Sequence, residues 1–76
     1  MKPDETIDAR GLLCPLPVLK LRKRLKDVPN GGEVALWADD PAAVVDVPHF
    51  CAEADHHLIT VDEADGYQVY RVRKGG

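Results

Sequence analysis

The 76 residues include 45% hydrophobic and 30% charged side chains, values that are typical of a folded globular protein and exclude a wholly disordered chain. A chain of this length builds one domain with one modest core, which excludes an active site at the bottom of a large cleft. The formal net charge of −3 argues against non-specific coating of nucleic acid by the whole surface.

The first third of the chain is predicted to form a short strand and then a helix. Residues 1–5 are polar and are expected to fray, whereas residues 6–9 alternate weakly, which indicates a strand that ends in a bend at Arg10 and Gly11. Apolar residues at 18, 21, 25 and 28 recur at helical spacing, and the turn-forming sequence Pro-Asn-Gly-Gly follows at 29–32. This pattern predicts a helix over residues 15–28.

The rest of the chain is predicted to add a strand, a second helix and a closing hairpin. Residues 33–38 are apolar and bounded by turn signals, which favours a largely buried strand. A second helix is expected to begin at Asp46, whose carboxylate suits an N-cap, because apolar residues follow at 47, 50, 51, 54 and 58. Residues 58–63 and 67–73 are predicted strands, and Asp65-Gly66 between them is a hairpin signal.

The predicted order of elements is therefore β-α-β-α-β-β within a single domain of residues 1–76. Strands that alternate with helices and close in a hairpin favour one mixed sheet with both helices packed on one face. We predict an α/β (α+β) two-layer sandwich whose other sheet face is partly open.

Cys14 stands directly before Pro15, at the predicted start of the first helix. Proline suits the first helical position, so Cys14 is predicted to be the N-cap, where the helix dipole favours a thiolate. Such a setting lowers a cysteine pKa from about 8.5 toward the range of about 3.5–7.5, although Pro17 removes one amide donor. The alternative is a small buried hydrophobe, but two prolines that fix the start of the helix favour an exposed, reactive thiol.

Cys51 lies on the apolar stripe of the second predicted helix, so we interpret it as an inert core residue. His49, His56 and His57 fall in or beside that helix and are expected on the surface. The sequence has no CxxC pair, and Cys51 with His56 and His57 does not match a recognised ligand spacing. We therefore expect no metal site and no cofactor.

Five basic residues crowd into seven positions of the first predicted helix. At about 100° per residue, Arg22, Lys23 and Lys26 share one flank with Leu19, while Lys20 and Arg24 fall on the other. A solvated helix face is the usual explanation of such a run. The alternative is a surface that steers an acidic partner or a phosphate toward the thiol.

Three stretches of the chain resemble the TusA/SirA family of small sulfur-carrier proteins: DARGLLCPLPVLKLRKRL, ADDPAAVVDVPHFC and the C-terminal RKGG. The resemblance covers residues 7–76, and the Cys-Pro-x-Pro motif gains specificity from Asp-Asp-Pro at 39–41 and Asp-Val-Pro at 46–48. It implies the same β-α-β-α-β-β sandwich. It also implies that Cys14 accepts sulfane sulfur as a persulfide from a donor such as a cysteine desulfurase and passes it to an acceptor protein.

The resemblance further implies supporting and docking roles. Gly11, Pro15 and Pro17 would shape the chain around the cysteine. Partner proteins would dock on the basic flank of the helix and on an acidic turn, at Arg22, Lys23, Lys26, Leu19 and Asp40. The chain would act as a carrier in a relay, for transfer-RNA thiolation, sulfur oxidation or other sulfur traffic, rather than as a stand-alone enzyme.

Four apolar residues depart from the polar or charged side chains that related proteins can have near the motif: Leu13, Leu16, Val44 and Val45. They predict a different partner or a hydrophobic docking surface. The chain has no apolar run of about 18 residues and no secretion signal at its start, so we expect a cytoplasmic protein that does not enter a membrane.

Other functions are open on the sequence alone. A nucleic-acid-binding module would use the basic helix with Trp37 or a tyrosine on the open sheet face, although the acidic total charge argues against it. A ubiquitin-like sulfur carrier would use the terminal Gly75-Gly76, but the predicted order of elements differs from that fold. A disulfide reductase would need the second cysteine of a CxxC motif.

Overall fold

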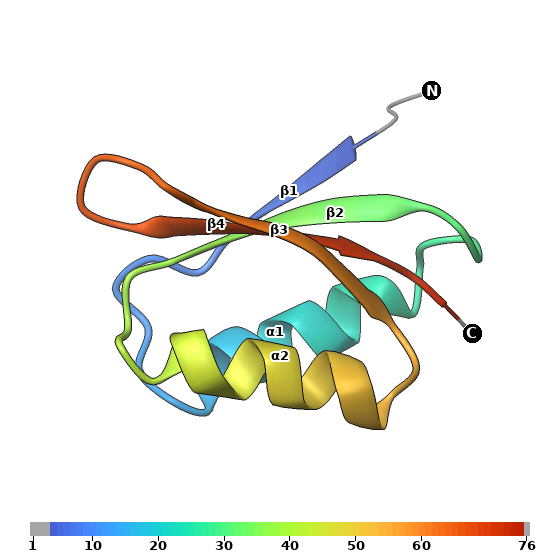
Figure 1. The fold of residues 1–76 in the computed structure, drawn as a ribbon, viewed down its shortest axis with the longest axis horizontal. Coiled ribbons are helices and arrows are strands. Elements are labelled where there is room, and N and C mark those ends of the chain that lie inside the picture. Colours follow the sequence, from blue (N-terminus) through green and yellow to red (C-terminus); the bar gives the residue numbers. More distant parts are fainter. Residues whose placement is uncertain (1–3, 76) are drawn as a thin grey trace.

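The structure, a computed structural model, describes residues 4–75 and contains four strands and two helices in those residues (Figure 1). In chain order they are β1 (Asp4–Asp8), α1 (Leu16–Leu25), β2 (Glu33–Ala38), α2 (Ala43–Glu53), β3 (His57–Glu63) and β4 (Gln68–Arg73). The predicted β-α-β-α-β-β order is confirmed.

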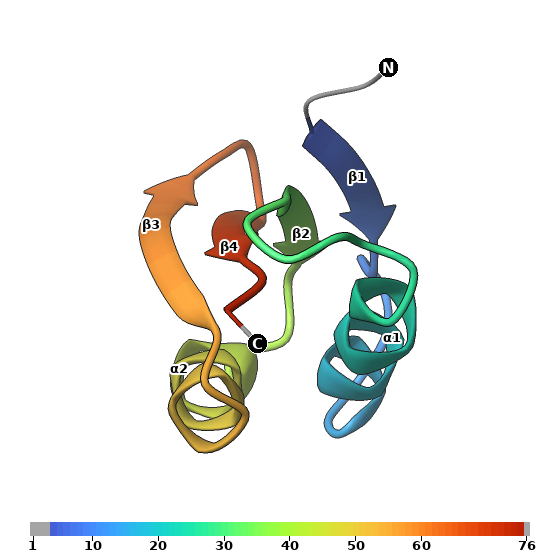
Figure 2. The ribbon, with the colours of Figure 1, turned by 90° about the vertical axis from the view of Figure 1, so that its right-hand side faces the viewer.

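The four strands form one mixed sheet in the order β1-β2-β4-β3. β1 runs parallel to β2, while β4 is antiparallel to both β2 and β3. Both helices cover the same face, with α1 beneath β1 and β2 and α2 beneath β3 (Figures 1 and 2). The predicted two-layer sandwich is therefore confirmed. Neither helix in residues 4–75 combines the length and the apolar character needed to cross a membrane.

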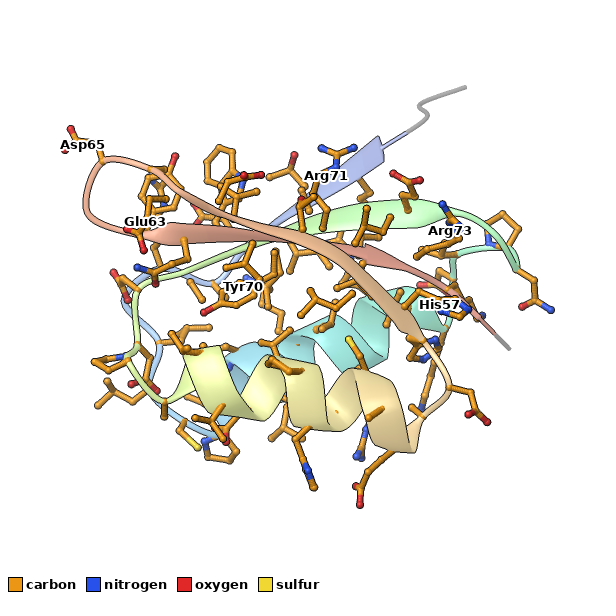
Figure 3. The ribbon with its side chains drawn as sticks, viewed as in Figure 1. His57, Glu63, Asp65, Tyr70, Arg71 and Arg73 are labelled. Carbon is orange, nitrogen blue, oxygen red and sulfur yellow. The ribbon has the colours of Figure 1, made fainter. Side chains whose placement is uncertain are left out.

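The core lies between the sheet and the helices because alternate strand residues point toward α1 and α2. Leu36 and Tyr70 pair across β2 and β4, and both are fully buried. Figure 3 shows Tyr70 projecting between the two layers, whereas Arg71, the next residue, projects from the opposite face of the sheet. Leu21 of α1 and Val47 of α2 complete the core from the other side.

β1 begins earlier than predicted. Asp4 and Glu5 pair with Glu33 and Val34, and Glu5 also forms an ion pair with Arg24 of α1. The expectation that residues 4 and 5 fray is therefore wrong, because the sheet and the helix both hold them. The expectation for residues 1–3 lies outside the described residues.

The helix boundaries also differ from the prediction. α1 ends at Leu25, although Val28 in the following turn is still buried. α2 begins at Ala43, three residues before Asp46, because Asp40 supports the turn that precedes it: its Oδ1 accepts a hydrogen bond from the Ala42 amide. Asp46 consequently lies in the first turn of α2 and is not the N-cap.

Candidate functional site

The loop between β1 and α1 presents Cys14, and two consecutive aspartates after β2 hold this loop. The Gly11 amide lies 3.0 and 3.1 Å from the two carboxylate oxygens of Asp39. Gly11 has a φ of +82°, a left-handed conformation that side chains other than glycine rarely adopt. The loop therefore needs glycine for its shape and Asp39 for its attachment to the sheet.

Asp40 fixes the cysteine backbone. Its Oδ2 accepts a hydrogen bond of 2.5 Å from the Cys14 amide, while Oδ1 accepts the bond from Ala42. Asp40 is only 8% exposed. Asp40 therefore supports the backbone of the Cys14 loop, and the docking role that the resemblance implies for it stays a prediction.

Cys14 itself is exposed, as its position before Pro15 predicted. It is not the N-cap, however. α1 begins at Leu16, so Pro15 occupies the N-cap position and Cys14 precedes it, joined to it by a cis peptide bond. Pro17 is buried in the first turn. The prolines thus locate the start of the helix correctly, but the thiol lies one residue further from the helix amides than predicted.

The partner of the thiol comes from the other helix. Cys14 Sγ donates a hydrogen bond of 2.8 Å to Asp46 Oδ2 on α2. This hydrogen bond, partial burial and the negative charges of Asp46 and Asp40 raise the pKa of the Cys14 thiol above its usual range. The predicted lowering of this pKa is therefore wrong, because the Asp46 carboxylate in contact with the sulfur disfavours a second negative charge there.

A shallow groove between α1 and α2 opens beside the sulfur. The α1 side contributes Cys14, Pro15, Val18 and Arg22, and the α2 side contributes Asp46, His49, Phe50 and Glu53. The Arg22 guanidinium lies 5.8 Å from the centre of the Phe50 ring, and His49 lies 3.5 Å from the Glu53 carboxylate. The sequence left open whether one of the three histidines approaches Cys14, and it did not connect Asp46 or Glu53 with the thiol, since no local pattern brings two helices together.

The two flanks of α1 differ in what they contact. On one flank, Lys20 Nζ donates a hydrogen bond of 2.7 Å to the Asp8 carbonyl, and Arg24 pairs with Glu5, so both bind β1. On the other flank lie the four proposed docking residues, which are exposed to solvent: Leu19, Arg22, Lys23 and Lys26. The flank that borders the groove therefore differs from the other one in that the basic side chains of the other flank contact β1.

Exposed apolar side chains occupy both helix starts near the cysteine. Leu13 and Leu16 surround the motif, and Val44 and Val45 stand at the beginning of α2. All four are classed as exposed, with Leu13 and Val45 exposed by 68% and 70%. Single exposed apolar residues are common on proteins, whereas exposed apolar residues that gather in one patch are typical of a contact surface.

Cys51 has the surroundings predicted for it. It is a free thiol, 2% exposed, in the core beneath the sheet, and burial raises its pKa to about 11. His56 is occupied elsewhere, since its Nδ1 accepts a hydrogen bond from the Gly75 amide. Within residues 4–75, no group of three histidine, cysteine or acidic side chains is arranged to hold a metal ion. Gly76, part of the tail considered above, lies outside the described residues.

The aromatic side chains named as possible stacking platforms already have a partner. The rings of Trp37 and Tyr67 lie 5.4 Å apart, and the Arg10 guanidinium lies 4.8 and 4.9 Å from their centres. Asp8 holds Arg10 in place through two side-chain hydrogen bonds. A base that stacked on the ring faces next to Arg10 would have to displace this arginine.

The chain is similar to a known family and to solved structures. The family model described as "Sulfurtransferase TusA" matches residues 5–74. Among solved structures, the chain is similar to a SirA-like protein from Desulfitobacterium hafniense, with a TM-score of 0.80 and 24% sequence identity over 93% of this chain and 97% of that one. The similarity to the solved structure concerns the fold. The family model covers nearly all of the residues that the structure describes.

Proposed function

Because the chain belongs to the TusA sulfurtransferase family, whose members carry sulfur between proteins, we propose that Cys14 accepts sulfane sulfur as a persulfide and relays it to an acceptor. The observation that carries this proposal is the exposed thiol of Cys14, whose backbone is fixed by Asp40 while its sulfur faces an open groove. A carrier must be reached by large partners at both steps, and a thiol at the surface needs no substrate pocket for this exchange.

The chemistry requires one reactive sulfur only. A cysteine desulfurase or another donor presents a persulfide, the Cys14 sulfur attacks its terminal sulfur, and an acceptor thiolate later attacks the sulfur that Cys14 holds. No cofactor is needed. We place this relay in the cytoplasm, where thiols such as Cys14 remain reduced.

The direct test is sulfur loading. The protein is incubated with a cysteine desulfurase and cysteine, its intact mass is recorded without reductant, and the modified peptide is mapped. We expect one added sulfur atom on Cys14, which reductant removes and Cys14→Ser abolishes, while Cys51→Ala still loads. If none of the three donors, the desulfurase, thiosulfate and tetrathionate, places sulfur on Cys14, the proposal fails. Nucleic-acid binding by α1 then becomes the leading alternative.

The same assay tests the docking surface, which we propose to be the groove-side flank of α1 with its neighbouring apolar residues. Arg22→Ala should slow delivery from the desulfurase but leave loading by a small persulfide unchanged, because only the protein donor needs a docking surface. Arg24→Ala is the matched control, since Arg24 contacts β1 instead. Equal slowing by both substitutions would contradict the assignment of the flank.

A further inference from the structure

Cys14 is held at two points, one on its backbone and one on its side chain. Its amide donates to Asp40 and its sulfur donates to Asp46, so backbone and side chain are tied to different elements, the loop after β2 and helix α2. Rotation of the sulfur about the Cα–Cβ bond would break the second contact. The thiol therefore rests against a carboxylate, although it is exposed to solvent.

The charged and titratable groups around the sulfur are unevenly placed. Those that line the groove or stand behind the loop are Asp40, Asp46, His49 and Glu53, together with Arg22 of α1. The two basic groups have other contacts, since Arg22 lies over Phe50 and His49 pairs with Glu53. The group in hydrogen-bonding contact with Sγ is the carboxylate of Asp46.

This placement matters for the persulfide more than for the thiol. A deprotonated persulfide is a nucleophile and resists attack by an acceptor thiolate, whereas a protonated persulfide accepts such an attack on its terminal sulfur. A carrier has to give its sulfur away, so it needs the protonated form. A carboxylate beside the sulfur disfavours a second negative charge there.

We propose that Asp46 is a catalytic residue that keeps the sulfur carried by Cys14 in the protonated, nucleophile-accepting form and relays the proton of Cys14 during loading and delivery. This inference rests on the proposed function and adds a residue and a chemical role to it.

The steps balance without an oxidant or a reductant. During loading, the bond between Cys14 Sγ and the terminal sulfur forms as the sulfur–sulfur bond of the donor breaks. The Cys14 proton passes to Asp46 and then to the departing donor thiolate. During delivery, an acceptor thiolate attacks the terminal sulfur, which leaves with its proton as the acceptor's persulfide. The bond to Sγ breaks with its electron pair on Sγ, and the resulting Cys14 thiolate takes one proton from water through Asp46. One sulfur–sulfur bond replaces another in each step.

The test uses Asp46→Asn, which keeps the size of the side chain and an oxygen that accepts a hydrogen bond but removes the charge. Two rates are measured between pH 6 and 9: alkylation of unloaded Cys14 by iodoacetamide, and cyanolysis of protein loaded chemically with glutathione persulfide, followed as thiocyanate. We expect alkylation near neutral pH to rise and cyanolysis to fall, each by about tenfold for a change of about one pKa unit. In the cyanolysis assay cyanide titrates identically for the parent and the variant, so the ratio of their rates reports the protein alone.

The proposal predicts that the rate of alkylation rises while the rate of cyanolysis falls. If both rates rise, Asp46 only lowers the reactivity of the sulfur in both of its forms. If both rates fall, Asp46 has only a structural role. If neither rate changes, Asp46 has no role. Each of these three results overturns the inference. Glu53→Gln removes a charge from the same groove without touching Sγ and should leave both rates within about twofold of the parent.

A second variant covers the case in which Asp46→Asn does not fold. Asp46→Glu retains the carboxylate and should keep cyanolysis within a few-fold of the parent; a collapse of cyanolysis in this folded variant would overturn the proposal. Failure of the carrier function itself looks different, because the parent would then take no sulfur from the desulfurase, thiosulfate or tetrathionate, although chemical loading with glutathione persulfide still succeeds.

Discussion

Cys14 and Cys51 carry the same side chain, and in both the pKa is raised, but for different physical reasons. Cys51 is 2% exposed and its pKa is raised by removal from water, which only local unfolding can reverse. Cys14 is exposed, and the largest cause of its raised pKa is one hydrogen bond to Asp46. A docking partner can exchange that hydrogen bond, whereas it cannot rehydrate the core. The exposed Cys14 thiol can therefore gain reactivity when a partner exchanges its hydrogen bond to Asp46, whereas the buried Cys51 thiol stays inert.

The largest effect that separates the two thiols should be their alkylation in the folded protein. With iodoacetamide at pH 8, Cys14 should react faster than Cys51 by a factor on the order of 100 or more, because Cys51 needs both an opening of the core and a thiolate. Peptide mapping by mass spectrometry gives both rates from one sample. In denaturant the two should react alike, and comparable rates in the folded protein would remove the distinction.

The fold was predictable because its signals are local. The apolar spacing of residues 18, 21 and 25 and the Asp65-Gly66 turn gave the elements in the right order, and Cys51 was placed in the core from its stripe alone. Element boundaries were less accurate. β1 begins two residues earlier than predicted because Asp4 and Glu5 pair with β2, a contact that no short window of sequence contains.

The site was predictable only in part, for the same reason. The exposure of Cys14 followed from its neighbouring prolines, but the sign of its pKa shift depends on Asp46, 32 residues further along the chain. Asp46 looked like a helix cap in the sequence. Its actual role is set by how α1 and α2 lie beside each other, which depends on the packing of both helices against the sheet rather than on any residue type.

A smaller effect should separate the supports of the Cys14 loop. Asp40→Ala leaves the amides of Cys14 and Ala42 without their carboxylate partner, and it should lower the free energy of unfolding by about 1–3 kcal/mol. Asp39→Ala should cost less, because Asp39 is exposed and water can replace its contact with the Gly11 amide. Urea denaturation of both variants measures the difference. An equal cost would show that burial of Asp40 adds nothing to its hydrogen bonds.

The smallest effect should appear as a pH dependence of stability that belongs to Cys51. Its pKa is about 11 in the folded protein and about 8.5 when unfolded, so between these values the unfolded chain binds fewer protons than the native one. The contribution of this thiol is fully present below about pH 8.5 and is lost as the pH rises toward 11, with a slope of at most about 1.4 kcal/mol per pH unit. Cys51→Ala should lack this slope, while Cys14 and Tyr70, present in both proteins, cancel in the comparison. Denaturation curves from pH 8 to 10.5 that run parallel for the two proteins would mean that Cys51 titrates in the core as it does in water.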